Sequence, residues 1–141
     1  MDISEIKTSE CSCDRCIEMC NRPCWGTPDD IKKIIDSGYG HKLMIDYWCD
    51  CTNGDIEMLC GALVGSEGRK APWWPKGKCT FLTNENKCEI HEIKPFEGKV
   101  AICKGGLRGE KHQDLRKEIV NMWNTEEGKQ LIEDWKKLVN Y

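Results

Sequence analysis

The chain has 141 residues, 39% of them apolar, with a formal net charge of −3 and eleven cysteines. This length predicts a single domain spanning residues 1–141. The negative charge argues against binding dominated by phosphate contacts, so nucleic acid is not an expected partner. No run of eighteen apolar residues predicts a membrane span, and residues 1–10 lack the features of a secretory signal. We therefore expect a cytoplasmic protein.

The first dense feature is Cys11–Cys24, which places five cysteines in fourteen residues. Such a segment is usually either a disulfide framework or a metal cage. Cytoplasmic thiols are kept reduced, and an odd total of eleven cysteines cannot all pair within one chain. Both points favour a metal cage. A bound metal would also supplement a core that is lean in apolar residues, since the mean hydropathy is −0.62.

A helix start follows this segment directly. Thr27 is a preferred N-cap, Pro28 suits the first helical position, and the acid Asp30 can accept from free amides. The pattern predicts a helix from about Pro28 to Ser37, ended by Gly38 in the left-handed conformation. Its buried stripe would consist of Ile31, Ile34 and Ile35.

Two strands are predicted next, Leu43–Trp48 and Asp55–Cys60, joined by the tight-turn pair Asn53-Gly54. The period of two along a strand puts Ile56, Met58 and Cys60 on the same face of the second arm. We therefore expect the Cys60 side chain to point into the core.

The following loop, Gly65–Lys78, combines basic residues with the adjacent tryptophans Trp73 and Trp74. Its basic residues are Arg69, Lys70, Lys76 and Lys78. One interpretation is a surface that binds nucleic acid or an acidic peptide. The other is that the tryptophans cover a small core while the lysines are solvated, because aromatic side chains supply much of the buried area in small domains.

The segment Cys79–His91 predicts a second hairpin that closes around Asn84–Asn86. Such a hairpin would bring Cys79 and Cys88 to adjacent strands, which is how zinc ribbons present a pair of ligands.

Two helices are predicted at the C-terminal end, Glu110–Trp123 and Thr125–Val139. Asn124 or Thr125 would cap the second helix, whose apolar face would carry Leu131, Trp135 and Leu138. We interpret both helices as packing elements, because they carry no evident chemistry. The predicted fold is a small α+β domain with short β-hairpins, an N-terminal and two C-terminal helices, and cysteine-rich loops pinned by metal. Its core motif spans residues 11–103, and residues 110–141 form a helical extension.

Cysteine thiolates bind zinc in sets of four and hold iron–sulfur clusters equally well. The candidate metal ligands are Cys13, Cys16, Cys20, Cys24, Cys60, Cys79, Cys88 and Cys103. Eight cysteines would fill two four-ligand sites, or one site with thiols in reserve. The remaining Cys11, Cys49 and Cys51 are interpreted as spare thiols near a chain end or a loop tip.

The histidines are less informative than the cysteines. His91 follows Cys88 at a Cys-x2-His spacing that zinc sites use, although it can equally be a surface histidine at a strand end. His41 and His112 have no other chemistry-bearing residues around them in the sequence.

The cysteine spacing resembles the YkgJ-like cysteine cluster family, whose members are described as zinc- or iron-chelating domains. The family signature begins with a C-x2-C-x2-C-C cluster. It continues with C-x-F-L, a further cysteine, an aromatic residue, a basic residue plus proline, and a last cysteine. The matching residues here are Cys13, Cys16, Cys20, Cys79-Thr80-Phe81-Leu82, Cys88, Lys94-Pro95 and Cys103.

This chain also departs from the family pattern. Met19 occupies the first of the two adjacent cysteine positions, so one ligand is lost or is supplied instead by Cys24. His91 stands where the family usually has tyrosine, Lys94 replaces arginine, and Cys103 comes several residues late. The resemblance implies metal binding but no particular reaction, and it leaves the fourth ligand open.

The predicted function is a metal-binding protein that holds zinc, or alternatively a [4Fe-4S] cluster, with a role in metal handling or in binding a protein partner. A second hypothesis is an iron–sulfur enzyme or redox protein with an open cluster position. A third is a nucleic-acid or peptide adaptor that uses the Trp73 and Trp74 loop. The sequence shows no glycine-rich motif after a strand that would hold a methyl donor.

Overall fold

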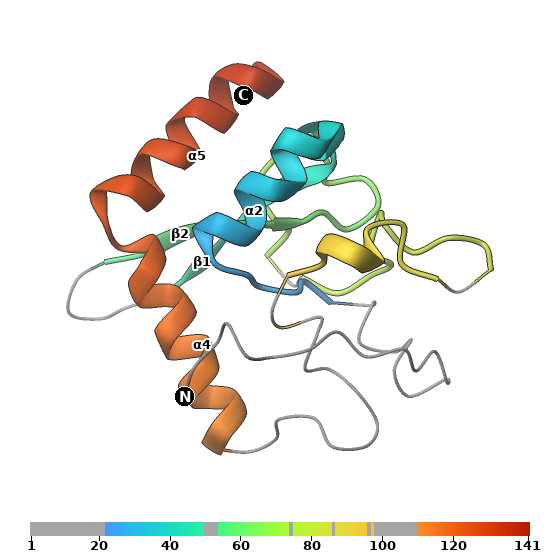
Figure 1. Ribbon diagram of the computed structural model, residues 1–141. Helices are drawn as coiled ribbons and strands as arrows, with labels where there is room; N and C mark the ends of the chain where they lie inside the picture. The colour runs from blue at the N-terminus through green and yellow to red at the C-terminus, as the bar shows by residue number, and fades with distance from the viewer. Residues whose placement is uncertain (1–21, 50–53, 74, 86, 96, 98–109) are drawn as a thin grey trace.

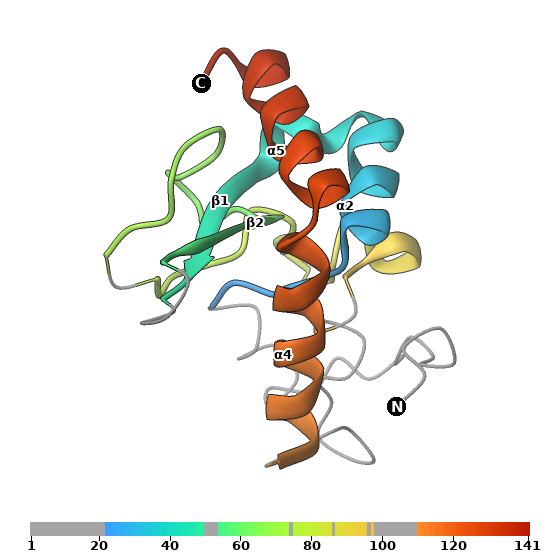
Figure 2. The same cartoon turned by 90° about the vertical axis from the view of Figure 1, so that its left-hand side faces the viewer.

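The computed structural model describes residues 22–49, 54–73, 75–85, 87–95, 97 and 110–141. These residues form an α+β fold of three α-helices and one two-stranded antiparallel sheet, as the sequence predicts. The helices are α2 (Pro28–Ile34), α4 (Glu110–Trp123) and α5 (Glu126–Val139). The strands are β1 (Leu43–Trp48) and β2 (Ile56–Gly61). Figures 1 and 2 show the three helices on one side of the sheet and the loop that follows β2 on the other, while the short 3-10 turn His91–Ile93 lies beside α2.

The start of α2 forms the predicted cap. The Thr27 side chain accepts from the Asp30 N–H at 3.1 Å, and the Asp30 carboxylate accepts from the Thr27 N–H at 3.1 Å. This reciprocal pair satisfies two amides that the first helical turn leaves without partners. Ile31 and Ile34 are buried in the core, and Ile35 packs against it.

The end of this helical stretch differs from the prediction. The α-helix ends at Ile34, and the chain continues through a π-helical segment, Ile35–Tyr39, and a 3-10 turn, Gly40–Lys42. Gly38 has φ 93°, the left-handed conformation expected for a helix-ending glycine. The chain therefore reaches β1 without a separate loop.

The first hairpin forms as predicted. The register pairs Leu43 with Gly61 and Trp48 with Ile56. Gly54 has φ 78°, while Asn53, the other half of the predicted turn, lies outside the described residues. Cys60 points inward with Ile56 and Met58, and all three side chains are buried.

The two C-terminal helices have bounds within one residue of those predicted, and Thr125 caps α5 by accepting from the Gly128 N–H at 3.1 Å. The predicted face of α5 is partly wrong. Trp135 is buried and Leu131 is half-buried, but Leu138 is 58% exposed. The buried side chain of Ile132 lies one residue along from Leu131, so the core-facing stripe is rotated relative to the predicted one.

Two indole N–H groups link these helices to the N-terminal half of the chain by hydrogen bonds. Trp123 at the end of α4 donates to the Gly26 carbonyl at 2.7 Å. Trp135 in α5 donates to the Gly40 carbonyl, also at 2.7 Å. Both rings are almost fully buried, so each bond satisfies a polar group that water cannot reach.

The predicted second hairpin exists as short bridges and not as regular strands. Leu82 and Cys88 form an antiparallel bridge, and the Glu89 N–H donates to the Phe81 carbonyl at 2.7 Å. Cys79 instead pairs with Leu63, which follows β2. Cys79 and Cys88 therefore do not face each other across this hairpin, because the chain from Cys79 turns to extend the main sheet.

Within the described part of the chain, no helix is long and apolar enough to cross a membrane.

Candidate metal centre

Cys60 is the most deeply buried of the candidate ligands that the structure describes. It lies near the end of β2, where it pairs with Met44 of β1 and forms a second bridge to Trp25 on its other side. Its side chain is a free thiol with 0% exposure. Burial raises the pKa of the Cys60 thiol well above its ordinary value, and the nearby acidic groups Asp46, Cys24, Cys79 and Glu97 raise it further.

Two other candidate ligands reach the same region from separate segments. Cys24 directly precedes Trp25, the residue that bridges to Cys60. Cys79 lies beside β2, because a side chain added at Gly61 would meet the Cys79 Sγ atom at 3.7 Å. Cys24 and Cys79 thus approach the end of β2 from two further parts of the chain, Cys24 beside the bridge to Cys60 and Cys79 beside Gly61. Cys24 and Cys79 are both half-buried.

Cys88 is half-buried and packs against the core. The other four candidate ligands, Cys13, Cys16, Cys20 and Cys103, lie outside the described residues, and so do Cys11 and Cys51. Cys49, interpreted above as a spare thiol, is exposed. Within the part of the chain that the structure describes, no group of three or more His, Cys, Asp or Glu side chains could hold a metal ion. A complete site would therefore need ligands from beyond that part of the chain.

His91 begins a short 3-10 turn, His91–Ile93, and its N–H donates to the Cys88 carbonyl at 3.2 Å. The Cys88-x2-His91 spacing is therefore used by a backbone turn.

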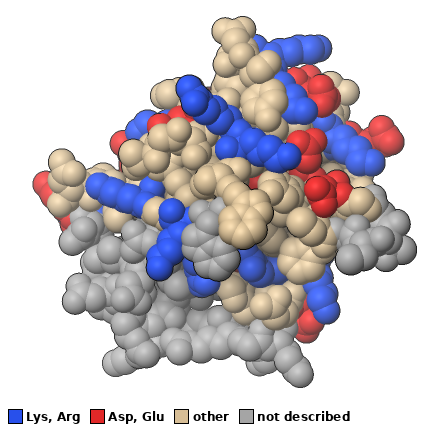
Figure 3. Space-filling model, turned by 180° about the vertical axis from the view of Figure 1, so that it is seen from behind, with Lys and Arg blue, Asp and Glu red and all other residues tan. Residues whose placement is uncertain are grey.

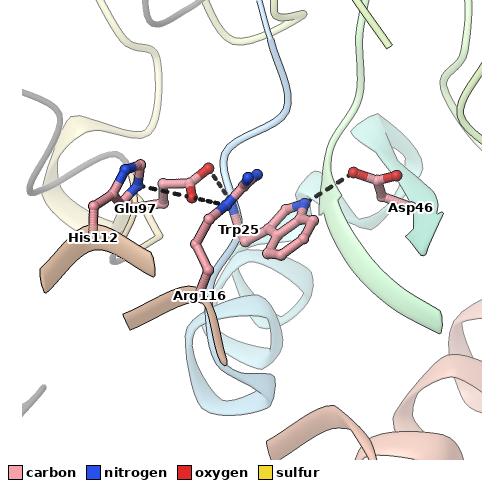
Figure 4. A network of polar contacts seen from close by, with 5 residues as sticks. All are labelled: Trp25, Asp46, Glu97, His112 and Arg116. Atoms are coloured by element: carbon pink, nitrogen blue, oxygen red, sulfur yellow. Dashed lines mark hydrogen bonds and ion pairs between the residues drawn. The ribbon is translucent and has the colours of Figure 1, made fainter. Parts of the chain in front are cut away.

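A buried polar network adjoins the Cys60 region, and its members come from four segments (Figure 4). Its centre is the Glu97 carboxylate, which is 2% exposed. Arg116 Nε of α4 donates to Glu97 Oε2 at 2.8 Å, and His112 Nε2 lies 3.2 Å from the same oxygen. The second carboxylate oxygen accepts from the Trp25 N–H at 3.3 Å.

The Trp25 side chain extends this network toward β1. Its indole N–H donates to Asp46 Oδ2 at 2.9 Å, and the Arg116 guanidinium carbon lies 4.0 Å from the centre of its ring. Trp48 packs edge-on against the same ring, with centroids 5.9 Å apart. Trp25 is therefore held from several directions, and the neighbouring Cys24 is attached to a well-fixed point of the backbone.

Sequence reasoning missed three members of this network: Glu97, His112 and Arg116. The two α4 residues are four positions apart, so one helix face carries both of them. The spacing of His112 and Arg116 on one helix face could have been read from the sequence. Their interaction with Glu97 could not, because Glu97 belongs to a different segment and no motif joins it to α4. The interpretation of α4 as a packing element alone is therefore incomplete.

No protein-family model, no curated protein and no solved structure matches this chain. The resemblance to the YkgJ-like family therefore stays a prediction based on the cysteine spacing.

The described donor set is suited to a thiophilic metal. Its members near the end of β2 are sulfur ligands, which zinc and iron–sulfur clusters take. The neighbouring carboxylates of Asp46 and Glu97 are already engaged with Trp25, Arg116 and His112. Their role is therefore to fix the surrounding chain.

Proposed function

We propose that this protein binds metal through its cysteines and that Cys60, Cys24 and Cys79 contribute to the ligand set. The observation that carries the proposal is that Cys24 and Cys79, far apart in the sequence, both come near the buried Cys60 at the end of β2. The remaining ligands would come from the Cys13, Cys16 and Cys20 cluster, from Cys88 and from Cys103. Zinc is the preferred metal, and a [4Fe-4S] cluster is the alternative.

The burial of Cys60 favours ligation over redox catalysis. A reactive cysteine needs a lowered pKa and access to solvent, whereas the Cys60 thiol has a raised pKa and no exposure. Metal binding displaces the proton and balances the charge of the thiolate within the protein. A buried sulfur that is inert toward small reagents is therefore well suited to a closed structural site.

The YkgJ-like family resemblance supports the same proposal, since it implies metal chelation without implying a reaction. On this basis the role of the protein would be metal handling or the binding of a protein partner through a metal-stabilised fold. A cytoplasmic location is part of the proposal, because reduced thiols are required for the ligands.

The proposal is tested by purifying the protein anaerobically under reducing conditions and measuring zinc, iron and sulfide together with the visible spectrum. Colourless protein with stoichiometric zinc supports a zinc site, and brown protein with iron and sulfide supports the cluster. Protein that contains no metal, and that takes up neither zinc nor a reconstituted cluster, overturns the proposal.

Variants then identify the ligands. Cys60→Ala and Cys79→Ser are each expected to lower the bound metal by at least about tenfold at equal free metal, since a missing thiolate opens a four-ligand site. Cys49→Ser is the matched control, because Cys49 is exposed and outside the proposed set. Far-UV circular dichroism of each variant separates the loss of a ligand from the loss of the fold. Unchanged metal content in the folded Cys60→Ala variant would remove Cys60 from the site.

A further inference from the structure

The loop that follows β2 returns to the sheet, where a short extended part of it pairs with β1. The sequence did not predict this pairing. The Gly68 N–H donates to the Leu43 carbonyl at 2.8 Å. The Ile45 N–H donates to the Arg69 carbonyl at 2.9 Å, and the Ala71 N–H donates to the Ile45 carbonyl at 2.7 Å. This is a parallel bridge between Ile45 and Lys70. Residues 68–71, which we name the edge segment, are therefore fixed alongside β1.

The bonding pattern shows which way Lys70 faces. In an extended chain, the N–H and C=O groups of successive residues point to opposite sides. Because Arg69 and Ala71 bond toward β1, the N–H and C=O of Lys70 point away from it. Neither group forms a hydrogen bond with the described part of the chain. The edge segment thus presents an outward donor and acceptor, the arrangement to which another extended chain can pair.

The loop that contains the edge segment carries exposed basic side chains. Arg69, Lys70, Lys76 and Lys78 all lie on the surface, and the Lys70 ammonium sits 4.7 Å from the centre of the Tyr47 ring. Figure 3, which views the molecule from behind relative to Figure 1, shows Lys and Arg side chains spread across the face with Asp and Glu side chains among them. Residues 65–78 carry these four basic side chains and one acidic side chain, Glu67, whereas the whole chain has a formal net charge of −3.

Trp73 lies two residues beyond the edge segment and is 88% exposed. The interpretation that both tryptophans cover the core is therefore wrong for Trp73, while Trp74 lies outside the described residues. Exposed tryptophans are enriched where proteins contact a partner, because the ring offers a large apolar area with few rotatable bonds. Ala71, the last residue of the edge segment, is buried and anchors this segment to the core.

We propose that this face binds an extended acidic segment of a partner protein. The partner backbone would pair with the N–H and C=O of Lys70, its carboxylates would meet the four basic side chains, and an apolar side chain would cover Trp73. Strand addition of this kind takes its affinity from the main chain and its specificity from alternating side chains. The proposal is independent of the metal site.

The open backbone edge favours a peptide over single-stranded nucleic acid. A nucleic acid would use the basic side chains and stack on tryptophan, but it has no use for an alternating backbone donor and acceptor. The negative net charge of the chain also weighs against a ligand that carries one charge per nucleotide.

The test uses fluorescence anisotropy at low salt with three labelled probes of equal length. The first is a peptide that alternates glutamate with valine, the second replaces glutamate with lysine, and the third is oligothymidine. The wild-type protein is expected to bind the acidic peptide at least about tenfold more tightly than either other probe. Equal or tighter binding of oligothymidine, or no binding of the acidic peptide, overturns the proposal.

Variants distinguish backbone pairing from simple charge attraction. Lys70→Pro removes the outward N–H, which β1 does not use, and is expected to weaken peptide binding by at least about tenfold. Lys70→Gln removes the same charge but keeps the N–H, so it should bind more tightly than Lys70→Pro. Trp73→Ala should also weaken binding, whereas Lys137→Glu on α5 should not. If Lys70→Pro does not fold, binding that survives Trp73→Ala unchanged overturns the proposal by itself.

Discussion

Glu97 joins the N-terminal and C-terminal halves of the protein through one buried carboxylate. Its main-chain N–H donates to the Trp25 carbonyl at 3.0 Å while its side chain accepts from the Trp25 N–H. On the other side it holds Arg116 and His112 of α4. A carboxylate with 2% exposure is no longer hydrated, and these donors compensate for the free-energy cost of burying its charge.

Replacing Glu97 with glutamine is expected to lower the free energy of unfolding by about 1–3 kcal/mol. The amide keeps the size of the side chain but removes the charge that Arg116 neutralises. Urea unfolding followed by circular dichroism measures the change. Glu92→Gln is the matched control, because Glu92 is exposed and surface changes usually alter stability by less than about 0.5 kcal/mol. Equal urea midpoints for the two variants would show that the Glu97 charge contributes nothing.

Residues differ in how far their surroundings can be predicted from the sequence. The inward direction of Cys60 follows from the period of two along a strand, which is a local property. The partners of His112 do not follow, since Glu97 lies 15 residues away on another segment. For Cys13, Cys16, Cys20 and Cys103, the sequence prediction stands alone, because they lie outside the described residues.

Among the elements, those defined by local chemistry were predicted and those defined by tertiary pairing were not. The cap at Thr27, the first hairpin and the Thr125 cap of α5 each depend on residues close to one another in the sequence. The edge segment depends instead on Leu43 and Ile45, more than twenty residues earlier. Its glycines and prolines indicated a loop. The pairing with β1 forms only when the folded sheet brings distant residues together.

The junction of α4 and α5 depends on a glycine that the sequence does not single out. A Cβ atom at Gly128 would lie 2.7 Å from the Trp123 carbonyl oxygen and 2.8 Å from the Trp123 Cα atom. Both are backbone atoms, and Trp123 is itself fixed by its bond to Gly26. The close approach of the two helices at this point therefore requires the absence of a side chain.

Gly128→Ala is accordingly expected to destabilise the protein by about 1–3 kcal/mol. The usual helix propensities predict the opposite sign, since alanine is favoured over glycine by about 1 kcal/mol inside a helix. The urea midpoint of the variant decides between them. Lys129→Ala, at the next and exposed position of α5, should change the stability by less than about 0.5 kcal/mol. A raised urea midpoint for Gly128→Ala would show that the end of α4 and the start of α5 can move apart without a loss of stability.

At the scale of the whole molecule, the apolar core and the proposed metal site hold different parts together. The core joins α2, α4 and α5 to the sheet, and its largest buried side chains include Trp123, Trp135 and Phe81. The thiols of Cys24, Cys60 and Cys79 come from the segment before α2, from β2 and from the segment after it. A metal bound there would link these three segments to one another.

Removing the metal is therefore expected to loosen one side of the molecule more than the other. At a free metal concentration about 100 times the dissociation constant, binding stabilises the fold by about 2.7 kcal/mol, or on the order of 10 °C in the melting temperature. Hydrogen exchange compares the metal-bound and chelator-treated protein. The amides of Thr80 and Val64, which pair the Cys79 segment with the chain after β2, should lose protection first.

The amides inside α5 should keep most of their protection under the same conditions, because that helix is held by Trp135 and the apolar core. Cys49→Ser should respond to chelation as the wild type does, whereas Cys60→Ala should show little difference with and without metal. An equal loss of protection in α5 and around Thr80 would mean that the metal stabilises the fold as one unit. No change at Thr80 on chelation would mean that Cys79 lies outside the site, and the metal would then have to be held by the other cysteines.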